Sequence, residues 1–273
     1  MADEPASPPF PMSDRPAASV PGHWLLARLG KKVLRPGGLR MTKALLAEAG
    51  IRAQRVVEFA PGMGGTASVV LDHDPAAYTG VDADPDAVKT IERLVSVRGR
   101  AVAARAEASG LPDDSADVVL CEGVLTIQST AVKSQIVAEG ARLLRPGGRY
   151  VLHELALRNV PEQDPEDVAA IRASLARAMH VNARPMSIAQ WRELLEGHGL
   201  TVLTVRTAPL ALLEPQRIVA DEGLLGALRF ARNVLRDRQA RSRVRTMART
   251  MRRHKHLLQA VGIVATRTEG ASP

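Results

Sequence analysis

The sequence predicts an α/β fold in which helices cover both faces of a parallel sheet, and three observations lead to this class. Strand-like segments alternate with helix-like segments of ten or more residues, the pattern of βαβ units. The segments VVLC and YVLHELAL lack the polar alternation of a sheet with one wet face, so both faces are expected to be covered. A glycine-rich stretch, PGMGGT, directly follows the first strand-like segment. Such a loop places a binding site at the carboxyl edge of the sheet.

Length and composition indicate one large domain, or one domain with an insertion, over the 273 residues. The single cysteine, Cys121, excludes an internal disulfide and favours a reducing compartment. No apolar run approaches about 18 residues, so no membrane span is expected. Acids and prolines at the start predict a disordered tail, residues 1–20, rather than a signal peptide. We therefore expect a cytoplasmic protein with a folded domain over residues 21–273.

The order of elements divides this domain into three parts. Residues 21–54 have the pattern of two short helices broken at Pro36-Gly37-Gly38 and would form an N-terminal helical lid. Residues 55–156 form the expected core, with strands at 55–59, 78–81, 101–104, 117–121 and 149–155 and helices ending near 71, 97 and 144. Helices at 162–178 and 188–198 and a strand at 200–207 follow. A helical pair within residues 211–258 is then expected as an insertion before the last strand, 262–268.

Carboxylates stand at the ends of the first two predicted strands, close to the glycine loop. Asp82 ends the second strand 24 residues after Glu58, where a carboxylate can accept both hydroxyls of a ribose. Glu58 ends the first strand, where it would repel a pyrophosphate bound at the following helix N-terminus. An ammonium or sulfonium group would be attracted to the same acid. The two acids therefore favour a cationic nucleoside over NAD.

Four segments in this order resemble the class I S-adenosylmethionine-dependent methyltransferases, especially their UbiE-like small-molecule members. The family's first motif is matched by VVEFAPGMGGT, and its ribose-binding strand end by GVDADP. The segment that closes over adenine is matched by AEASGLPDDSADVVLCEG, and the turn and strand after the fourth helix by LLRPGGRYVLHE. The similarity runs from about Arg55 to Ala156, with Ala60 in place of the family's first loop glycine. It implies a Rossmann-like class I methyltransferase sheet, S-adenosylmethionine as cofactor, and methyl transfer from a sulfonium.

The resemblance also implies which residues meet the cofactor. Glu107 takes the acidic position near the exocyclic amine of adenine, with Ala108 beside it. No metal site is expected. The full set expected at the cofactor is Glu58, Ala60, Pro61, Gly62, Gly64, Thr66, Asp82, Ala83, Glu107, Ala108 and Cys121.

Candidates for the chemistry lie where the fourth and fifth predicted strands end. Methyl transfer relies mainly on alignment and desolvation, and a base is needed only when the acceptor must lose a proton. His153 is the candidate base because its free pKa lies near neutrality, and the alternative is that it only hydrogen-bonds a neighbouring loop. Glu122 either shapes the acceptor pocket or pairs with a buried arginine. Asp221-Glu222-Gly223, at the start of the inserted helices, either caps the first of them or meets the substrate.

The net charge of +8 is concentrated in one segment. Residues 229–255 hold eleven Arg or Lys and one acid, so this run carries +10 and the rest of the chain −2. The run contains one aromatic residue, Phe230, and no pattern for base stacking, which disfavours nucleic acid. The alternatives are a solvated helix face and contact with an anionic small molecule or partner.

These observations predict a methyltransferase that acts on a small-molecule acceptor, with the N-terminal helices and the inserted pair as walls of the acceptor pocket. An apolar and arginine-bearing wall would suit an acceptor with an anionic group. The second hypothesis is an RNA or protein methyltransferase that uses the 229–255 face. The third is a cofactor-binding domain that has lost catalysis and serves assembly. The acceptor, its accepting atom and a homodimer stay open at this point.

Overall fold

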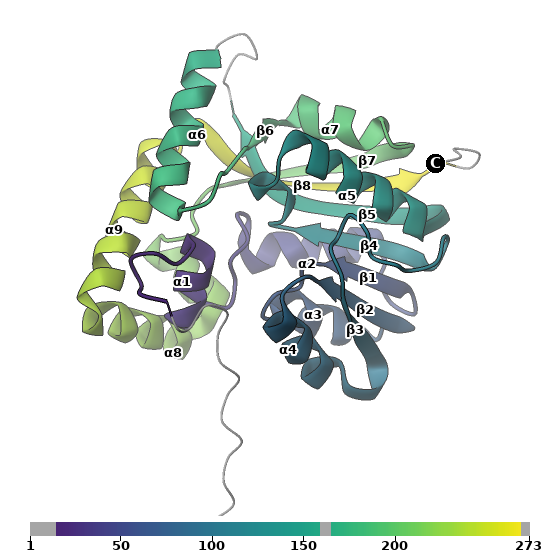
Figure 1. Ribbon diagram of the computed structural model, residues 1–273, viewed down its shortest axis with the longest axis horizontal. Helices are drawn as coiled ribbons and strands as arrows, with labels where there is room; N and C mark the ends of the chain where they lie inside the picture. The colour runs from purple at the N-terminus through teal and green to yellow at the C-terminus, as the bar shows by residue number, and fades with distance from the viewer. Residues whose placement is uncertain (1–14, 159–164, 269–273) are drawn as a thin grey trace, which may run out of the picture.

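The computed structural model describes residues 15–158 and 165–268 and has one central sheet with helices on both faces (Figure 1). The strand order is β3-β2-β1-β4-β5-β8-β7, and a short β6 pairs with β5. β1 to β5 run parallel, whereas β8 is antiparallel to both β5 and β7. The α/β class is confirmed, and the last strand departs from the expected parallel arrangement. The strands are β1 (Arg55–Phe59), β2 (Ala77–Asp82), β3 (Gly99–Ala103), β4 (Ala116–Glu122), β5 (Leu144–Leu157), β6 (Met186–Ser187), β7 (Leu200–Pro209) and β8 (Leu258–Arg267).

The strands are apolar on both sides because helices cover both faces of the sheet. On one face, α5 and α7 pack over alternate strand residues such as Phe59 and Leu152. On the other face, α2, α3 and α4 pack over the intervening residues such as Val56 and Val151. The helices are α1 (Gly22–Arg28), α2 (Gly38–Ala49), α3 (Gly65–Leu71), α4 (Pro85–Val95), α5 (Thr130–Leu143), α6 (Pro165–Met179), α7 (Ile188–Glu196), α8 (Pro215–Arg236) and α9 (Arg238–Arg253), with single turns η1 (Ser96–Arg98) and η2 (Leu125–Ile127).

A third core lies beyond the carboxyl end of β5, where α1, α6, α8 and α9 pack together at one side of the sheet (Figure 1). We call this group of four helices the helical cap. Its buried side chains include Leu25 from α1, Leu175 from α6, Phe230 from α8 and Met247 from α9. The helical pair expected from the sequence, α8 and α9, is therefore part of a larger unit that also contains the N-terminal helix.

The N-terminal segment is more ordered than its composition predicts. Arg243 of α9 donates hydrogen bonds to the backbone carbonyls of Ala17, Ala18 and Val20. Val20 is fully buried. The predicted disorder therefore does not hold for residues 15–20, because the half-buried Arg243 satisfies three of their carbonyl groups; the rest of the predicted tail lies outside the described residues.

Two element boundaries also differ from the predicted ones. The first helix ends at Arg28, well before the predicted break at Pro36-Gly37-Gly38, so residues 29–37 form a long loop. β5 begins at Leu144 and includes the predicted turn at residues 145–148. The long loop matters for function, since it enters the cavity described next.

Candidate functional site

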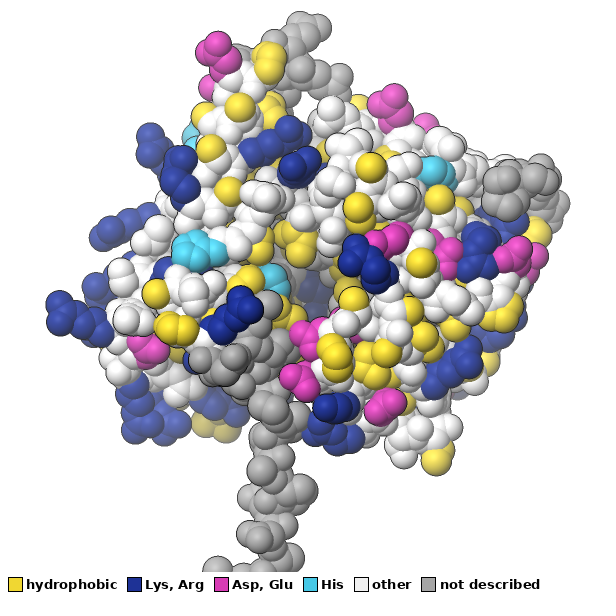
Figure 2. All heavy atoms as spheres, in the orientation of Figure 1, with side chains coloured by type: hydrophobic (Ala, Val, Ile, Leu, Met, Phe, Trp, Pro, Cys, Tyr) yellow, Lys and Arg dark blue, Asp and Glu magenta, His cyan; other side chains and the backbone are white. Residues whose placement is uncertain are grey.

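A cavity of about 350 Å³ lies between the carboxyl edge of the sheet and the helical cap. Figure 2 looks onto this face, which is hollowed between the two parts. One side, the loop half, is lined by the glycine loop and by strand ends that include Glu58, Asp82 and Glu122. The other side, the cap half, is mainly apolar. Its apolar lining comprises Trp24, Leu34, Leu175, Met179, Leu210, Leu212 and Met251.

The glycine loop turns sharply because three of its residues have left-handed backbone. The angle φ is 50° at Ala60, 55° at Gly62 and 76° at Gly64. Glycine adopts this conformation readily, whereas it costs alanine about 1–2 kcal/mol. The loop is tied to β2, since the N–H of Ala60 donates to Val81 O at 2.8 Å and that of Gly62 to Asp82 Oδ2 at 3.0 Å. The backbone of the loop between β1 and α3 is thus held against the cavity.

The acids that end β1 and β2 both line the cavity, and burial raises the pKa of both. Glu58 accepts a hydrogen bond from the Tyr78 hydroxyl at 2.7 Å. Burial outweighs this bond and raises the pKa of Glu58 to about 8. Asp82 accepts hydrogen bonds from the N–H groups of Gly62 and Asp84, which oppose the effect of burial. At neutral pH Glu58 therefore holds a proton unless a cation lies beside it.

Glu122, at the end of β4, is the centre of a buried polar network. Its oxygens accept hydrogen bonds from Thr42 at 2.8 Å, Thr66 at 2.6 Å and His153 Nδ1 at 2.8 Å. Arg35 Nε lies 3.1 Å from the same carboxylate. Burial opposes the charge, but Arg35 and His153 outweigh it and lower the pKa of Glu122 to about 2. The structure contains the ion pair with a buried arginine that was one of the two hypotheses for Glu122. The carboxylate also lines the cavity, which agrees with the other hypothesis.

His153 has no free ring nitrogen. Its Nε2 accepts a hydrogen bond from the N–H of Gly37 at 2.9 Å, so Nδ1 carries the proton that is donated to Glu122. The side chain is fully buried and is not among the residues that line the cavity. The geometry matches the alternative in which His153 holds a neighbouring loop, and it gives a general base no support.

Glu154, which stands beside His153 at the end of the fifth predicted strand, is a further functional candidate. This fully buried carboxylate accepts hydrogen bonds from the N–H groups of Val124 at 2.8 Å and Leu125 at 2.6 Å, and from Thr126 N–H and hydroxyl at 3.1 Å and 2.6 Å. It thereby fixes the η2 turn, whose residue Ile127 lines the cavity. An acid inside an otherwise apolar buried strand was the available signal.

A second ion cluster holds the long N-terminal loop against α8. The buried Lys31 Nζ lies 3.4 Å from Glu222 and 3.8 Å from Asp221. Glu222 also accepts hydrogen bonds from the N–H groups of Lys32 at 3.0 Å and Val33 at 2.9 Å. The two acids therefore neither cap α8, which begins at Pro215, nor line the cavity. They position the loop that carries Arg35 into it.

Six of the eleven residues expected at the cofactor line the cavity, and their contact with a cofactor stays a prediction. Among those that do not line it, Cys121 is buried within β4, and Glu107 forms an ion pair with Arg105 at 2.5 Å. The lining residues are Glu58, Ala60, Pro61, Gly62, Thr66 and Asp82, and the others are Gly64, Ala83, Glu107, Ala108 and Cys121.

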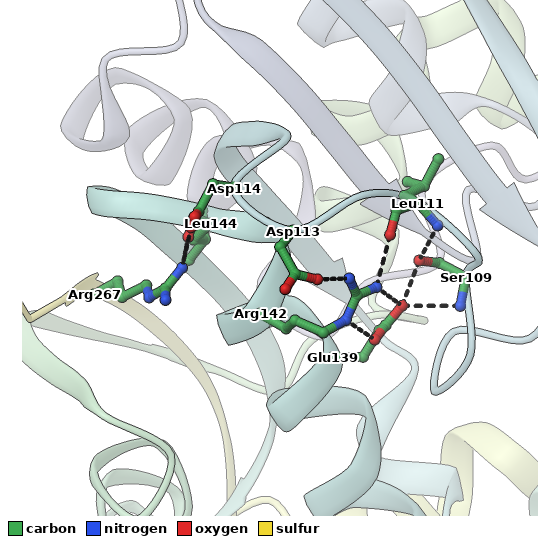
Figure 3. Close-up of polar contacts among 8 residues, drawn as sticks. All are labelled: Ser109, Leu111, Asp113, Asp114, Glu139, Arg142, Leu144 and Arg267. Atoms are coloured by element: carbon green, nitrogen blue, oxygen red, sulfur yellow. Dashed lines mark hydrogen bonds and ion pairs between the residues drawn. The ribbon is translucent and has the colours of Figure 1, made fainter. Parts of the chain in front are cut away.

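The segment predicted to close over adenine is anchored by α5 (Figure 3). Glu139 accepts a hydrogen bond from the N–H of Ser109 at 3.0 Å, and Arg142 donates to Leu111 O at 2.8 Å and to Glu139 at 2.7 Å. Burial alone would raise the pKa of Glu139, but Arg142 and Ser109 lower it below the ordinary value. Further contacts join Arg142 with Asp113 and Arg267 with Asp114. The polar network thus fixes residues 109–114 from the outer side.

The arginine-bearing wall expected from the inserted helices is absent from the lining of this cavity. From the run 229–255, only Met251 lines the cavity, because the arginines of α8 and α9 point elsewhere. The cations that do line it, Lys32 and Arg35, come from the long N-terminal loop. The helical periodicity of the sequence predicted that the arginines lie off the apolar stripe. It could not predict that residues 32–35 reach the cavity.

Comparison with known proteins gives a family match over part of the chain. Residues 57–152 match a family model described as a methyltransferase domain. An uncharacterized protein of Haemophilus influenzae is 29% identical over 248 residues, 89% of this chain and 96% of the relative. A fatty-acid O-methyltransferase of Mycolicibacterium smegmatis is 29% identical over 45% of this chain and 46% of its own. A phthiotriol/phenolphthiotriol dimycocerosates methyltransferase of Mycobacterium ulcerans is 29% identical over 66% of this chain and 59% of its own.

Solved structures share the whole fold at low identity. The cyclase SpnF has a TM-score of 0.67 at 16% identity, with 90% of this chain and 93% of that chain covered. A geranyl diphosphate methyltransferase in complex with SAM has a TM-score of 0.60 at 16% identity, over 84% and 85% of the two chains. A geranyl diphosphate C-methyltransferase of Streptomyces coelicolor has a TM-score of 0.59 at 13% identity, over 84% and 77%. A cyclase among them indicates that this fold does not fix the reaction.

Proposed function

We propose that the chain is a class I S-adenosylmethionine-dependent methyltransferase and that it methylates a small molecule with a largely apolar body. One observation carries the proposal: one cavity has the carboxyl groups of Glu58, Asp82 and Glu122 at strand ends on one side and an apolar wall on the other. The carboxylate side suits a cationic nucleoside, and the apolar side suits the acceptor.

The loop half fits S-adenosylmethionine in charge and in hydrogen-bonding capacity. Each oxygen of Asp82 accepts one backbone hydrogen bond, which leaves lone pairs for the hydroxyls of a ribose. Glu58 offers a carboxyl group to the cationic end of the ligand, and a cation there would restore its charge. A dinucleotide would instead bring its pyrophosphate towards the ionised Glu122, and its negative charge would not favour the ionised form of Glu58. When bound, the cofactor supplies an electrophilic methyl group on a sulfonium.

The cap half supports an acceptor with an apolar body. Its lining includes Leu175, Met179, Leu212 and Met251, which offer no hydrogen-bonding groups beyond the weakly accepting sulfurs of the methionines. Two proteins similar to this chain are named for a fatty acid and for geranyl diphosphate, molecules with hydrocarbon bodies. Arg35 pairs with Glu122 through Nε, but its buried Nη2 has no hydrogen-bond partner among the described residues. A polar end of the acceptor could therefore meet Arg35, Lys32 or the η2 turn.

The residues of the cavity position groups and exclude water, and neither His153 nor Glu122 offers a free base. His23 also lines the cavity, and burial lowers its pKa to about 4, so it is a neutral but weakly basic imidazole. Both nitrogens of His153 are hydrogen-bonded, and Glu122 is an ionised carboxylate with four donors around it. Alignment and desolvation are therefore the contribution that this chain makes to the transfer. An acceptor that must lose a proton would release it to His23, to solvent or to a group of its own.

The test uses the full chain and S-adenosylmethionine with an isotopically labelled methyl group. We expect the cofactor to bind, NAD not to bind, and the label to enter an organic-soluble compound from a fractionated extract of small apolar molecules. Label in RNA or protein would favour the second hypothesis. Cofactor binding without transfer to any fraction would favour the inactive assembly domain. Tight NAD binding with no response to S-adenosylmethionine would overturn the proposal.

A further inference from the structure

The outer face of α8 exposes a row of leucines that no part of the described chain covers. Leu224, Leu225, Leu228 and Leu235 are between 59% and 84% exposed. Leu224, Leu228 and Leu235 follow one another at steps of four and seven residues, so they lie on one face of the helix. With Val219, this helix carries five of the eight exposed large apolar side chains among the described residues. Isolated exposed leucines are ordinary, but a row of them marks a contact surface.

A row of arginines runs beside these leucines. Arg229, Arg232 and Arg236 follow at steps of three and four residues and are exposed. None of the three takes part in the ion pairs of the described residues. The run 229–255 as a whole carries +10, and Figure 2 shows Lys and Arg side chains gathered along the edge formed by α8 and α9. The leucine row thus has a cationic margin. The acids near it are engaged elsewhere, since Asp237 caps α9 and Asp221 and Glu222 pair with Lys31.

We propose that this face of α8 docks on the surface of an anionic lipid bilayer. A helix that lies in the membrane interface inserts apolar side chains between headgroups and acyl chains while cations at its margin contact lipid phosphates. The leucine row and the arginine row supply both parts. Within residues 15–158 and 165–268, no helix is long and apolar enough to cross a membrane, so the contact is made at the surface.

Other occupants fit this face less well. A second copy of the chain would bring two rows of arginines together, and these rows repel each other. Nucleic acid would match the arginines but would leave the leucines against water, and Phe230, the one aromatic residue of the run, is buried. The methyl acceptor does not explain the arginines, because none of them lines the cavity. Only an anionic surface with an apolar interior uses both rows.

The docked helix is also the one that holds the loop at the cavity. Asp221 and Glu222 lie immediately before Leu224 and clamp Lys31 of the long N-terminal loop. Gly223 lies between the clamp and the leucine row. Its φ of 72° is not helical, so α8 is kinked between these two parts. Docking through the second part leaves the clamp intact, so it requires no change at the cavity.

The test is co-sedimentation of the full chain with vesicles of phosphatidylcholine alone or of phosphatidylcholine mixed with phosphatidylglycerol. We expect the chain to sediment with the anionic vesicles, to stay in solution with the neutral ones, and to be released by added salt. A chain that stays in solution with both kinds of vesicle overturns the proposal. A dimer in sedimentation velocity without vesicle binding also overturns it and assigns the face to a second copy.

Two sets of variants locate the contact. Arg229→Gln, Arg232→Gln and Arg236→Gln together should weaken vesicle binding about a hundredfold, since each cation near an anionic surface contributes about a factor of five. The matched control, Arg52→Gln, Arg93→Gln and Arg100→Gln, removes the same charge from exposed residues outside α8. Equal losses in the two sets would mean that total charge alone drives binding, which contradicts a docking face.

The leucine set separates a bilayer from an acidic protein or polyanion. Leu224→Gln, Leu225→Gln and Leu228→Gln should weaken vesicle binding about tenfold or more, because the apolar insertion is lost. These side chains are exposed, so thermal unfolding should change little. Val97→Gln with Leu203→Gln, two exposed apolar sites off the helix, is the control. Unchanged vesicle binding by the leucine set contradicts the proposal.

Discussion

The loop half and the cap half of the cavity are built in different ways. The polar contacts of the loop half join neighbouring strands: Tyr78 with Glu58, and Gly62 with Asp82, each pair 20 residues apart. The clamp of the cap half joins Lys31 with Glu222, 191 residues apart. The first half is therefore a local product of the parallel sheet, whereas the second exists only after distant segments have met. Acceptor specificity can then vary in the cap while the loop half stays the same.

The two halves meet at one ion pair. Arg35 from the long N-terminal loop reaches Glu122 at the end of β4, and both side chains are at least nine-tenths buried. His153 links the same carboxylate to the backbone of Gly37. Substitutions at this junction should therefore have larger effects than substitutions within either half.

Glu122→Ala should give the largest effect, a loss of about 3–5 kcal/mol in the free energy of unfolding. The reason is that Arg35 would stay buried without a counter-charge, and the donors Thr42 and Thr66 would lose their acceptor. Urea unfolding measures the change. The control Glu92→Ala removes an exposed acid and should stay within about 0.5 kcal/mol of the parent. Similar values for the two variants would mean that the junction contributes little.

Asp82→Ala should weaken binding of S-adenosylmethionine about ten- to a hundredfold, since a charge-assisted hydrogen bond contributes roughly 1.5–3 kcal/mol. Calorimetry measures the Kd, and a thermal melt checks that loss of the bond to Gly62 does not unfold the loop. Asp86→Ala is the matched control. Asp86 forms an exposed ion pair with Lys89, so this variant should bind S-adenosylmethionine like the parent. If Asp82→Ala also binds like the parent, the ribose assignment is wrong.

Met179→Ala tests the other half and should raise the acceptor KM about tenfold while the cofactor Kd stays the same. Met179 lines the cap half and is only partly buried, so truncation removes apolar contact with an acceptor at moderate cost to the fold. The measurement is transfer of labelled methyl at varied acceptor concentration. A parallel rise in the cofactor Kd would show that the two halves are not separable.

Cofactor binding should depend on pH through Glu58. Burial raises its pKa to about 8, and a cationic ligand binds the ionised form, so affinity falls as pH drops below the pKa. Between about pH 7 and about pH 9 the affinity should rise about tenfold. Glu58→Gln should remove the part of this dependence that belongs to the protein and leave only titration of the ligand. Identical pH profiles for parent and variant would contradict the role of Glu58.

The sequence predicted the loop half because its signals are contiguous. β1 was predicted with its observed bounds, and the glycine loop and the acids Glu58 and Asp82 stand at consecutive strand ends. The helices of the cap were predicted one by one, but no local pattern indicates that Trp24 and Met251 line the same space. His153 shows a further limit. A histidine at a strand end has the same sequence pattern whether it faces a cavity or accepts a hydrogen bond from Gly37.

The smallest effect is expected at Ala60, which stands where the methyltransferase family has its first loop glycine. Ala60→Gly removes left-handed strain of about 1–2 kcal/mol but adds about 0.4–1 kcal/mol of unfolded-state entropy, so the net stabilisation should be about 1 kcal/mol or less. Ala53 has a φ of 57° in an exposed turn away from the cavity, so Ala53→Gly should give the same gain in thermal stability. Only Ala60→Gly should alter the cofactor Kd, by about threefold or less, because Ala60 lines the cavity and Ala53 does not. A change in Kd that both variants share would arise from general stability, and the contact between Ala60 and the cofactor would then have no support.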